Sequence, residues 1–331
     1  MATSALKSLP GGQKADWIVS KEFSEILVGH PKIHEVFAYD RKNLGLGKWL
    51  KILFDLSKNE YTDVYDLHRS LRSTIARTLF RFFSPQTRWS SVSKQRLKTM
   101  ALYMFKGFLP KPFWPRPWIS LFAELTGGTE ARADLPHFQV APSAKIMSEH
   151  FLKNSQSDLD KDFLFLMPAS QWKTKQWPVE KFVSLVESMM DRVPVVLGTS
   201  KDEASRKLSD ILAQKNIFHL DLRSKLTLTE TAQIFYRFKA KSLFVGNDTG
   251  LFHLAEAMGM KSFSIMGPTS SSLGFGPSTE LGAEIGRDLG CRPCSKSGKI
   301  CLRFWDQHAC LKKLEANEVI DKLHALDGVD S

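Results

Sequence analysis

The second half of the chain alternates between two patterns of hydrophobic residues. Short apolar runs, which are typical of buried strands, are each followed by a stretch with the spacing of an amphipathic helix. The predicted strands are 163–167, 193–197, 217–220 and 242–245, and the predicted helices between them are 179–190, 201–214 and 228–238. Such alternation predicts a parallel sheet with helices packed against it.

The clearest single unit spans residues 243–268, where a strand (243–245), a turn (246–250), a helix (251–258) and a second strand (262–266) follow one another. The carboxyl ends of strands in open α/β sheets are where ligands bind, and the N–H groups that begin a helix attract anions. Thr249 offers a hydroxyl there, Gly250 allows close backbone approach, and His253 lies one helical turn beyond Thr249. The structural alternative for Asp248 is a simple helix N-cap, and for His253 it is an ordinary core or surface histidine.

The first half is less regular. It predicts strands at 15–20 and 64–67 and helices at 48–57 and 69–83, with Leu71, Ile75, Leu79 and Phe82 on the apolar side of the last helix. Four prolines make 110–117 a loop or extended segment. A chain of 331 residues exceeds the usual size of one core, so we expect two domains, 1–155 and 156–331, joined near the polar stretch 154–161.

The composition, with 43% hydrophobic and 24% charged residues, is that of a soluble globular protein. No apolar run approaches the roughly 18 residues that span a bilayer, and the first residues lack the pattern of a secretory signal. We therefore expect a cytoplasmic protein.

The net charge of +11 is concentrated in the first half, which carries +10 over residues 1–155 against +1 over the remainder. Eleven Lys or Arg residues and no acidic residue lie between Asp66 and Glu124, interleaved with aromatic residues. Such a field favours an anionic partner, and three remain open: nucleic acid, an anionic membrane surface, or an anionic glycolipid lying in that surface. For any single arginine, a solvated helix face is the simpler interpretation.

The motifs resemble those of glycosyltransferase family 9, the lipopolysaccharide heptosyltransferases. The donor-site signature of that family matches Asp248-Thr249-Gly250, His253, Leu254-Ala255 and Gly267-Pro268-Thr269. Further segments similar to the family are Lys175-Gln176-Trp177-Pro178 with Phe182, residues 195–198 with Glu203, Asp221-Leu222, residues 226–230, Asp16-Trp17-Ile18-Val19, Gly29-His30-Pro31 and residues 63–67. The resemblance covers most of the chain and is strongest from 163 to 310.

The resemblance implies an α/β fold of the GT-B type, with two Rossmann-like domains facing a cleft. It implies an inverting glycosyltransferase that moves a heptose, or a related sugar, from an ADP-linked donor to an inner-core acceptor of lipopolysaccharide, with no metal required for catalysis. The donor-binding residues that it implies are Ser170, Gln171 and Lys175 near the diphosphate, Glu203 at the ribose, and Asp248, Thr249, Gly250 and His253 around the sugar and diphosphate.

The basic first half fits the acceptor side, with Arg69 and Arg72 as candidate acceptor-binding residues. The acceptor would then be an anionic glycolipid, with peripheral contact at the inner face of the inner membrane, and no nucleic-acid partner is expected. A basic nucleic-acid-binding protein is the weaker alternative, because it explains the charge and leaves the donor signature unexplained.

The chain departs from the family at its start. The family opens with a strand and a Gly-Asp loop whose Asp is the implied general base, whereas residues 3–9 already resemble part of the first helix. We therefore expect an incomplete N-terminal domain, either because the start is truncated or because the protein is a variant with another base or no activity. Asp66 and His68 are candidate substitute bases, although Asp66 at a strand end is more often a cap. A nonenzymatic protein that binds a nucleotide sugar or anionic glycan is the corresponding alternative.

Four cysteines fall within twenty residues, at positions Cys291, Cys294, Cys301 and Cys310. Reduced thiols at this density suit a structural zinc site with four thiolate ligands. The second pair lacks the close spacing of a zinc motif, so four free thiols remain the alternative.

Overall fold

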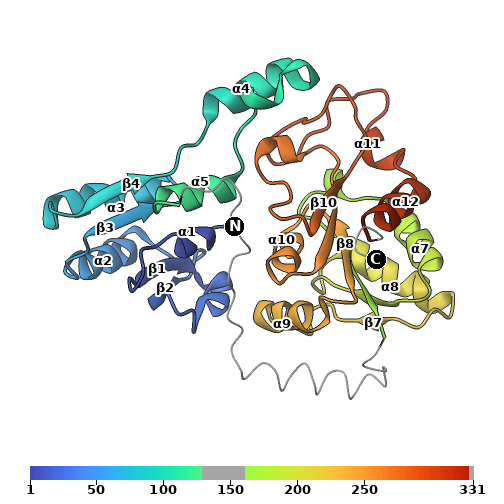
Figure 1. Ribbon diagram of the computed structural model, residues 1–331, viewed down its shortest axis with the longest axis horizontal. Helices are drawn as coiled ribbons and strands as arrows, with labels where there is room; N and C mark the ends of the chain where they lie inside the picture. Colours follow the sequence, from blue (N-terminus) through green and yellow to red (C-terminus); the bar gives the residue numbers. More distant parts are fainter. Residues whose placement is uncertain (129–160, 328–331) are drawn as a thin grey trace. The chain divides into compact units, whose positions relative to one another are not determined.

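The computed structural model describes residues 1–128 and 161–327, which form two compact units (Figure 1). Among the described residues, the first unit contains 1–95 and 118–128, and the second contains 96–117 and 161–327. The predicted boundary near residue 155 lies outside the described residues. The segment 96–117, which the sequence placed in the first domain, clusters with the second unit instead.

A six-stranded parallel sheet forms the centre of the second unit, with the order β10-β9-β8-β5-β6-β7. The strand order therefore reverses at β5, which pairs with β6 on one side and β8 on the other. The strands are β5 (Phe163–Met167), β6 (Val193–Val196), β7 (Leu220–Asp221), β8 (Leu243–Asn247), β9 (Lys261–Ile265) and β10 (Gly282–Ile285).

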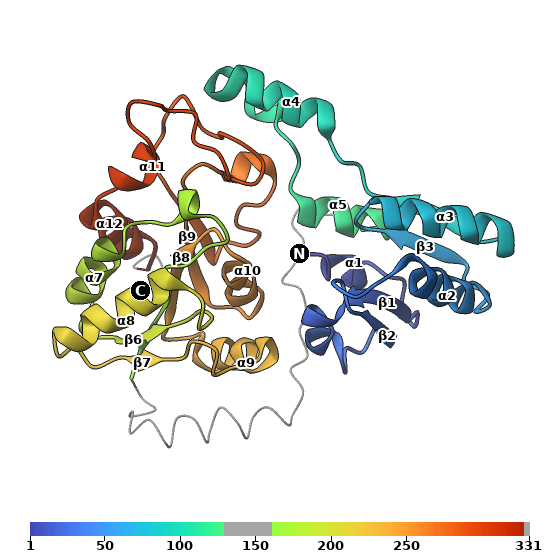
Figure 2. The same cartoon turned by 180° about the vertical axis from the view of Figure 1, so that it is seen from behind.

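Helices pack on both faces of this sheet, as Figures 1 and 2 show. The helices of this unit are α4 (Arg96–Phe105), α7 (Val179–Ser188), α8 (Glu203–Gln214), α9 (Leu228–Phe238), α10 (Gly250–Ala257), α11 (Ala309–Lys312) and α12 (Ala316–Asp327). On one face, α7, α8 and α12 share a core with Leu164 and Leu166 of β5. On the other face, Phe235 of α9 contacts Phe165 and Phe244 edge-on. Because its central strands are covered on both faces, they are apolar along nearly their whole length.

The sequence located β5 to β9 and α7 to α10 to within a few residues, and it missed β10 and α12. β10 is short and its residues Gly282, Ala283 and Glu284 are only partly buried, so no apolar run marks it. The start of α9 is well marked, because Thr227 and Glu230 form a reciprocal capping box.

The first unit holds two separate two-stranded parallel sheets. Strand β1 (Ala15–Ser20) pairs with β2 (Ile33–Tyr39), and β3 (Asp63–Asp66) pairs with β4 (Arg88–Ser91). Its helices are α1 (Ser4–Lys7), α2 (Leu46–Ser57), α3 (Leu71–Phe83) and α5 (Trp118–Leu125). Most residues of β1 and β3 are only partly buried, in contrast to the fully buried central strands of the second unit.

The predicted apolar side of α3 is wrong at both of its ends, where Leu71 and Phe82 are exposed. Ala76 and Phe80 are instead the buried residues, because the middle of the helix packs against Trp49 and Leu53 of α2. At the two ends, Arg72 and Phe83 still contact Trp49 and Phe54 of α2, while the side chains of Leu71 and Phe82 beside them are exposed.

The segment 96–117 forms α4 and two short 3-10 turns, Lys106–Phe108 and Lys111–Phe113. The second turn lies in the proline-rich stretch that the sequence assigned to a loop. The ammonium group of Lys106 donates a hydrogen bond of 3.2 Å to the Cys291 carbonyl, which ties this segment to the loop before α11. Among the helices in residues 1–128 and 161–327, none is long and apolar enough to cross a membrane.

Candidate functional site

A cavity of about 700 Å³ opens in the second unit where β5 and β8 end. The place follows from topology, because the strand order reverses at β5 and leaves room between the loops that leave adjacent strands. All eight residues that the sequence assigned to donor binding line this cavity: Ser170, Gln171, Lys175, Glu203, Asp248, Thr249, Gly250 and His253. Residues spread over eighty-four positions are thus brought to one surface by the sheet.

Asp248 lies at the centre of the cavity wall. Its Oδ2 lies 2.5 Å from the Lys175 Nζ and accepts a hydrogen bond of 2.7 Å from the Thr269 hydroxyl. The Ser170 hydroxyl donates to the Asp248 carbonyl at 3.2 Å. The side chains of Lys175 and Asp248 are 13% and 16% exposed, so water screens this ion pair only weakly.

Asn247, immediately before Asp248, fastens the surrounding loops together. It is fully buried, and its amide donates to the Pro168 carbonyl at 2.5 Å while its Oδ1 accepts from the Trp177 N–H at 3.0 Å. The Trp177 indole donates in turn to the Leu314 carbonyl. One amide therefore fixes the end of β8 to the segment after β5 and to the start of α7.

Two buried polar atoms on the cavity wall have no hydrogen-bond partner among the described residues: the hydroxyl of Thr249 and the Nδ1 of His253. Thr249 is the N-cap residue of α10, yet its side chain makes no cap hydrogen bond. The Thr249 hydroxyl therefore does not cap the helix. An unpaired buried polar group costs free energy unless a ligand or water satisfies it, so the Thr249 hydroxyl is suited to binding a polar ligand.

Gly250 begins α10 beside Thr249. A Cβ atom built on Gly250 would meet no protein atom within 4 Å, so protein packing does not require glycine at this position. The open space beyond it belongs to the cavity wall, where the first N–H groups of α10 carry partial positive charge. An anion can therefore approach the backbone closely here.

Glu256 supports this wall from behind. Its carboxylate is fully buried and accepts hydrogen bonds from the N–H and hydroxyl groups of both Ser278 and Thr279. Burial alone raises the pKa of Glu256, but its neighbour His253 and these hydrogen bonds together hold it below the ordinary value of 4.5. The carboxylate therefore stays ionised, 3.8 Å from the His253 Nδ1, a distance too long for a hydrogen bond.

The rim of the cavity carries exposed charges of both signs. Glu203 at the start of α8 is exposed and pairs with Lys173 at 3.2 Å. Sequence reasoning missed Thr269 as a side chain that contacts Asp248, as well as the lining cations Lys173, Lys201 and Lys296. Thr269 is the last residue of the Gly-Pro-Thr motif and could have been found from that motif. The sequence around the three lysines contains no motif that distinguishes them from other lysines.

The loop that contains Thr269 is held by Arg292. This guanidinium is nearly buried, pairs with Glu284 at 2.9 Å and donates to the carbonyls of Gly267, Met266 and Thr269. The cysteine-containing segment thereby supports the cavity through an arginine.

The cysteines themselves form no metal centre in the part of the chain that the structure describes, where no group of three or more His, Cys, Asp or Glu side chains is arranged to hold an ion. Cys291, Cys294, Cys301 and Cys310 are free thiols. Burial raises the pKa of Cys310 to about 11, with a further contribution from the neighbouring thiols, so it is a neutral thiol near pH 7. The structural zinc stays a prediction.

The candidate base and acceptor residues all belong to the first unit. The buried Asp66 accepts hydrogen bonds from the backbone N–H groups of His68 and Arg69, at 3.0 and 2.6 Å, so it acts as a cap for the turn after β3. His68 and Arg69 are exposed. The guanidinium of Arg72 lies 5.8 Å from the centre of the Tyr39 ring.

Comparison with known proteins agrees with this geometry. Residues 49–303 match the family described as glycosyltransferase family 9 (heptosyltransferase). The chain is 26% identical to the lipopolysaccharide heptosyltransferase 1 of Pseudomonas aeruginosa, over 98% of this chain and 92% of that protein.

Solved structures with the same fold include a family 9 glycosyltransferase from Veillonella parvula (TM-score 0.75, 15% identity, covering 98% of this chain and 92% of that one). The ADP-heptose heptosyltransferase II of E. coli gives a TM-score of 0.70 at 18% identity, covering 98% and 93%. An E. coli heptosyltransferase solved with ADP gives 0.64 at 17%, covering 98% and 95%. The fold is thus α/β of the GT-B type, and the chain belongs to glycosyltransferase family 9, the heptosyltransferases.

Proposed function

We propose that this enzyme is an inverting transferase that moves heptose from ADP-heptose to an inner-core acceptor of lipopolysaccharide. One observation carries the proposal: a cavity at the switch point of the sheet gathers the Lys175–Asp248 ion pair, the start of α10 and the unpartnered hydroxyl of Thr249. A cation, free N–H groups and an unpaired hydroxyl are what a diphosphate-linked sugar needs.

In this proposal the diphosphate lies against the start of α10 and Lys175. Charge grows on the departing ADP as the bond to the sugar breaks, and a fixed ammonium group stabilises that charge. Ser170 and Gln171 line the same wall, and Glu203 on the rim accepts hydrogen bonds from ribose hydroxyls. Asp248 and His253 hold the sugar. The chemical step in this scheme uses no metal.

The acceptor in this proposal is an anionic glycolipid at the inner face of the inner membrane, reached from the cytoplasm. The part of the acid-free basic stretch that lies in the first unit supports this choice, with the exposed Arg69 and with Arg72 as the candidate contacts. The relatives also support it, because they include lipopolysaccharide and lipooligosaccharide heptosyltransferases.

A transfer assay tests the proposal: ADP-heptose and a deacylated inner-core acceptor are added to the protein, and released ADP and glycosylated product are measured. Thr249→Val removes the unpartnered hydroxyl and keeps the shape of the side chain. We expect it to weaken binding of ADP-heptose about tenfold, the value of one hydrogen bond to a charged group.

Thr229→Val is the matched control, because the Thr229 hydroxyl is also buried without a partner among the described residues yet lies on α9 and does not line the cavity. It should bind ADP-heptose like the unaltered protein. Absence of both ADP binding and product would refute the proposal. Binding of ADP-heptose without transfer would favour the alternative of a nonenzymatic nucleotide-sugar-binding protein.

A further inference from the structure

Helix α4 presents its apolar side to solvent. Leu97, Met100 and Met104 have the i, i+3, i+7 spacing that places side chains on one face of a helix, and Phe108 follows in the next turn. Leu97, Met104 and Phe108 are 78%, 68% and 95% exposed. An amphipathic helix ordinarily buries this stripe, so α4 carries a surface for an apolar partner.

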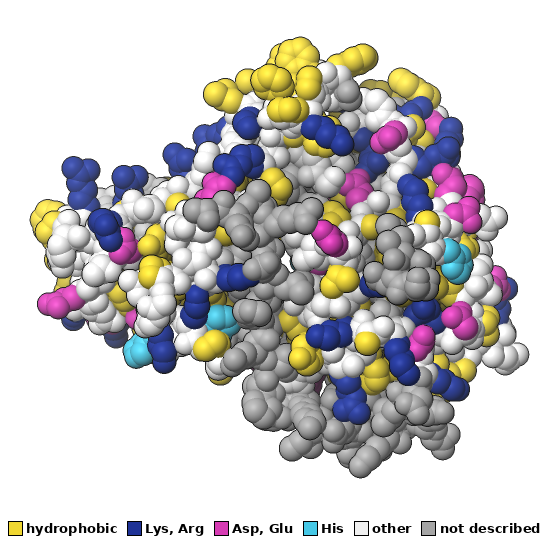
Figure 3. All heavy atoms as spheres, viewed as in Figure 1, with side chains coloured by type: hydrophobic (Ala, Val, Ile, Leu, Met, Phe, Trp, Pro, Cys, Tyr) yellow, Lys and Arg dark blue, Asp and Glu magenta, His cyan; other side chains and the backbone are white. Residues whose placement is uncertain are grey.

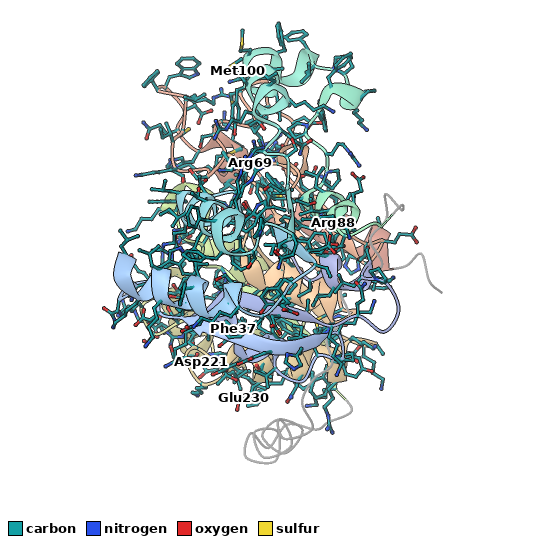
Figure 4. The ribbon with its side chains drawn as sticks, turned by 90° about the vertical axis from the view of Figure 1, so that its left-hand side faces the viewer. Phe37, Arg69, Arg88, Met100, Asp221 and Glu230 are labelled. Atoms are coloured by element: carbon teal, nitrogen blue, oxygen red, sulfur yellow. The ribbon has the colours of Figure 1, made fainter. Side chains whose placement is uncertain are left out.

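The opposite side of α4 is the one that holds it to its own unit. Leu102 is fully buried, and Lys106 just after the helix donates to the Cys291 carbonyl. The outward direction of the stripe is therefore set by packing. Figure 3 shows hydrophobic side chains gathered over α4, and Figure 4 shows Met100 at the opposite end of the second unit from Asp221 and Glu230.

Cations flank the stripe on both sides. Successive residues in a helix are rotated by about 100°, so Arg96 and Lys98 lie to either side of the row that contains Leu97. The sequence contains no acidic residue from 67 to 123 that would offset them. An apolar face bordered by Lys and Arg without acids is complementary to a surface that is apolar inside and anionic outside.

We propose that α4 is the element by which this protein docks on an anionic phospholipid bilayer. Leu97, Met100, Met104 and Phe108 enter the boundary between headgroups and acyl chains, and Arg96 and Lys98 contact lipid phosphates. The inference deepens the proposed function. It rests on that function only for the reason why the protein would bind a membrane.

The loop before α11 extends this surface. Phe304 and Trp305 are strongly exposed, and the Arg303 guanidinium lies 5.9 Å from the centre of the Trp305 ring. Figures 1 and 2 place this loop at the same end as α4. Aromatic rings beside cations are typical of residues at the level of lipid headgroups.

The docking element and the donor cavity belong to the same unit. The backbone that accepts the hydrogen bond from Lys106 at Cys291 continues to Lys296, which lines the cavity, and to Gly298, whose carbonyl accepts a hydrogen bond from Thr174. Docking through α4 would therefore bring the cavity to the membrane surface together with its bound donor.

Vesicle co-sedimentation tests the inference, using the full chain with vesicles that contain phosphatidylglycerol and with vesicles of phosphatidylcholine alone. Leu97→Gln/Met104→Gln should weaken binding to the anionic vesicles at least about tenfold, equivalent to about 1.4 kcal/mol. Arg96→Gln/Lys98→Gln should weaken it about fivefold for each cation, and added salt should reduce the effect.

The matched control is Met190→Gln/Phe218→Gln, which changes two exposed apolar side chains of the same unit outside this surface, each 59% exposed. It should bind vesicles like the unaltered protein. Transfer to a deacylated acceptor in solution should be unchanged in Leu97→Gln/Met104→Gln, while transfer to an acceptor embedded in vesicles falls.

Equal vesicle binding by Leu97→Gln/Met104→Gln and the unaltered protein would overturn the inference. So would a change in oligomeric state in place of vesicle binding, since this would make α4 a contact between copies of the chain. If no heptose is transferred at all but vesicle binding still depends on α4, the proposed function fails and the docking inference stands.

Discussion

The ion pair between Lys175 and Asp248 allows two opposite predictions from neighbouring substitutions. If Lys175 binds the diphosphate, Lys175→Met removes its charge and keeps most of its apolar stem. A hydrogen bond to a charged group contributes about 1.5–3 kcal/mol, and each 1.4 kcal/mol is a factor of ten. We expect the affinity for ADP to fall about ten- to a hundredfold.

Asp248→Asn acts in the other direction. With no ligand bound, the Asp248 carboxylate lies 2.5 Å from the Lys175 Nζ and therefore competes with a phosphate for the same ammonium group. Asparagine removes that negative charge and keeps an oxygen that can accept from Thr269. We expect ADP to bind as tightly as before or more tightly, while the extra affinity of ADP-heptose over ADP decreases.

Isothermal titration calorimetry with ADP and with ADP-heptose measures both effects. Lys207→Met is the control, because Lys207 also forms an ion pair, with Glu180, but neither residue lines the cavity. The reasoning is refuted if Lys175→Met leaves the ADP affinity within about twofold of its original value. It is equally refuted if Asp248→Asn weakens ADP binding as much as Lys175→Met does.

Three further predictions concern the frame around the cavity, and urea unfolding followed by tryptophan fluorescence, to which the buried Trp177 contributes, measures each of them. Asn247→Ala should cost about 2–5 kcal/mol, because it leaves the Trp177 N–H and a buried carbonyl unpaired; a loss below 1 kcal/mol would contradict this. Gly282→Ala should destabilise the protein, because its Cβ would lie 2.5 Å from a Glu256 carboxylate oxygen, and the loss should shrink in a Glu256→Ala background. The pKa of Glu256 is lowered in the folded protein, so its contribution to stability is complete above the ordinary value of 4.5 and is lost as the pH falls through the folded pKa. Glu256→Gln should therefore flatten the pH dependence of the free energy of unfolding below pH 4.5.

The fold of the second unit could be predicted because each central strand is buried on both faces and so is apolar throughout. β5 and β8 consist of such runs, and the helices between the strands carry a regular apolar spacing. β10 lacked this signal because its residues are mostly half-buried. In the first unit, the partly exposed β2 and β4 have mixed sequences, and for the same reason neither was found.

Segment 96–117 shows a different limit of prediction from sequence. The sequence gives its basic charge and its apolar residues but not which side of a helix faces the protein. For α3, the same kind of pattern proved misleading at Leu71 and Phe82, whose side chains are exposed although the helix packs on α2. Only the packing of Leu102 and the hydrogen bond from Lys106 fix the outward direction of α4.

The choice between a cap and a functional group was open in the sequence at Asp66, and the structure raises the same question at Thr249, the N-cap residue of α10. Both follow a strand and precede a helix, so local pattern alone favours a cap for each. In the structure the Asp66 carboxylate accepts two backbone N–H groups, and its role as a cap is sufficient to explain it. The Thr249 hydroxyl makes no such bond and is buried on the cavity wall. A polar ligand that hydrogen-bonds to this hydroxyl removes the free-energy cost of leaving it unpaired. We therefore expect a bound donor to raise the free energy of unfolding of the second unit, in part through its contact with Thr249.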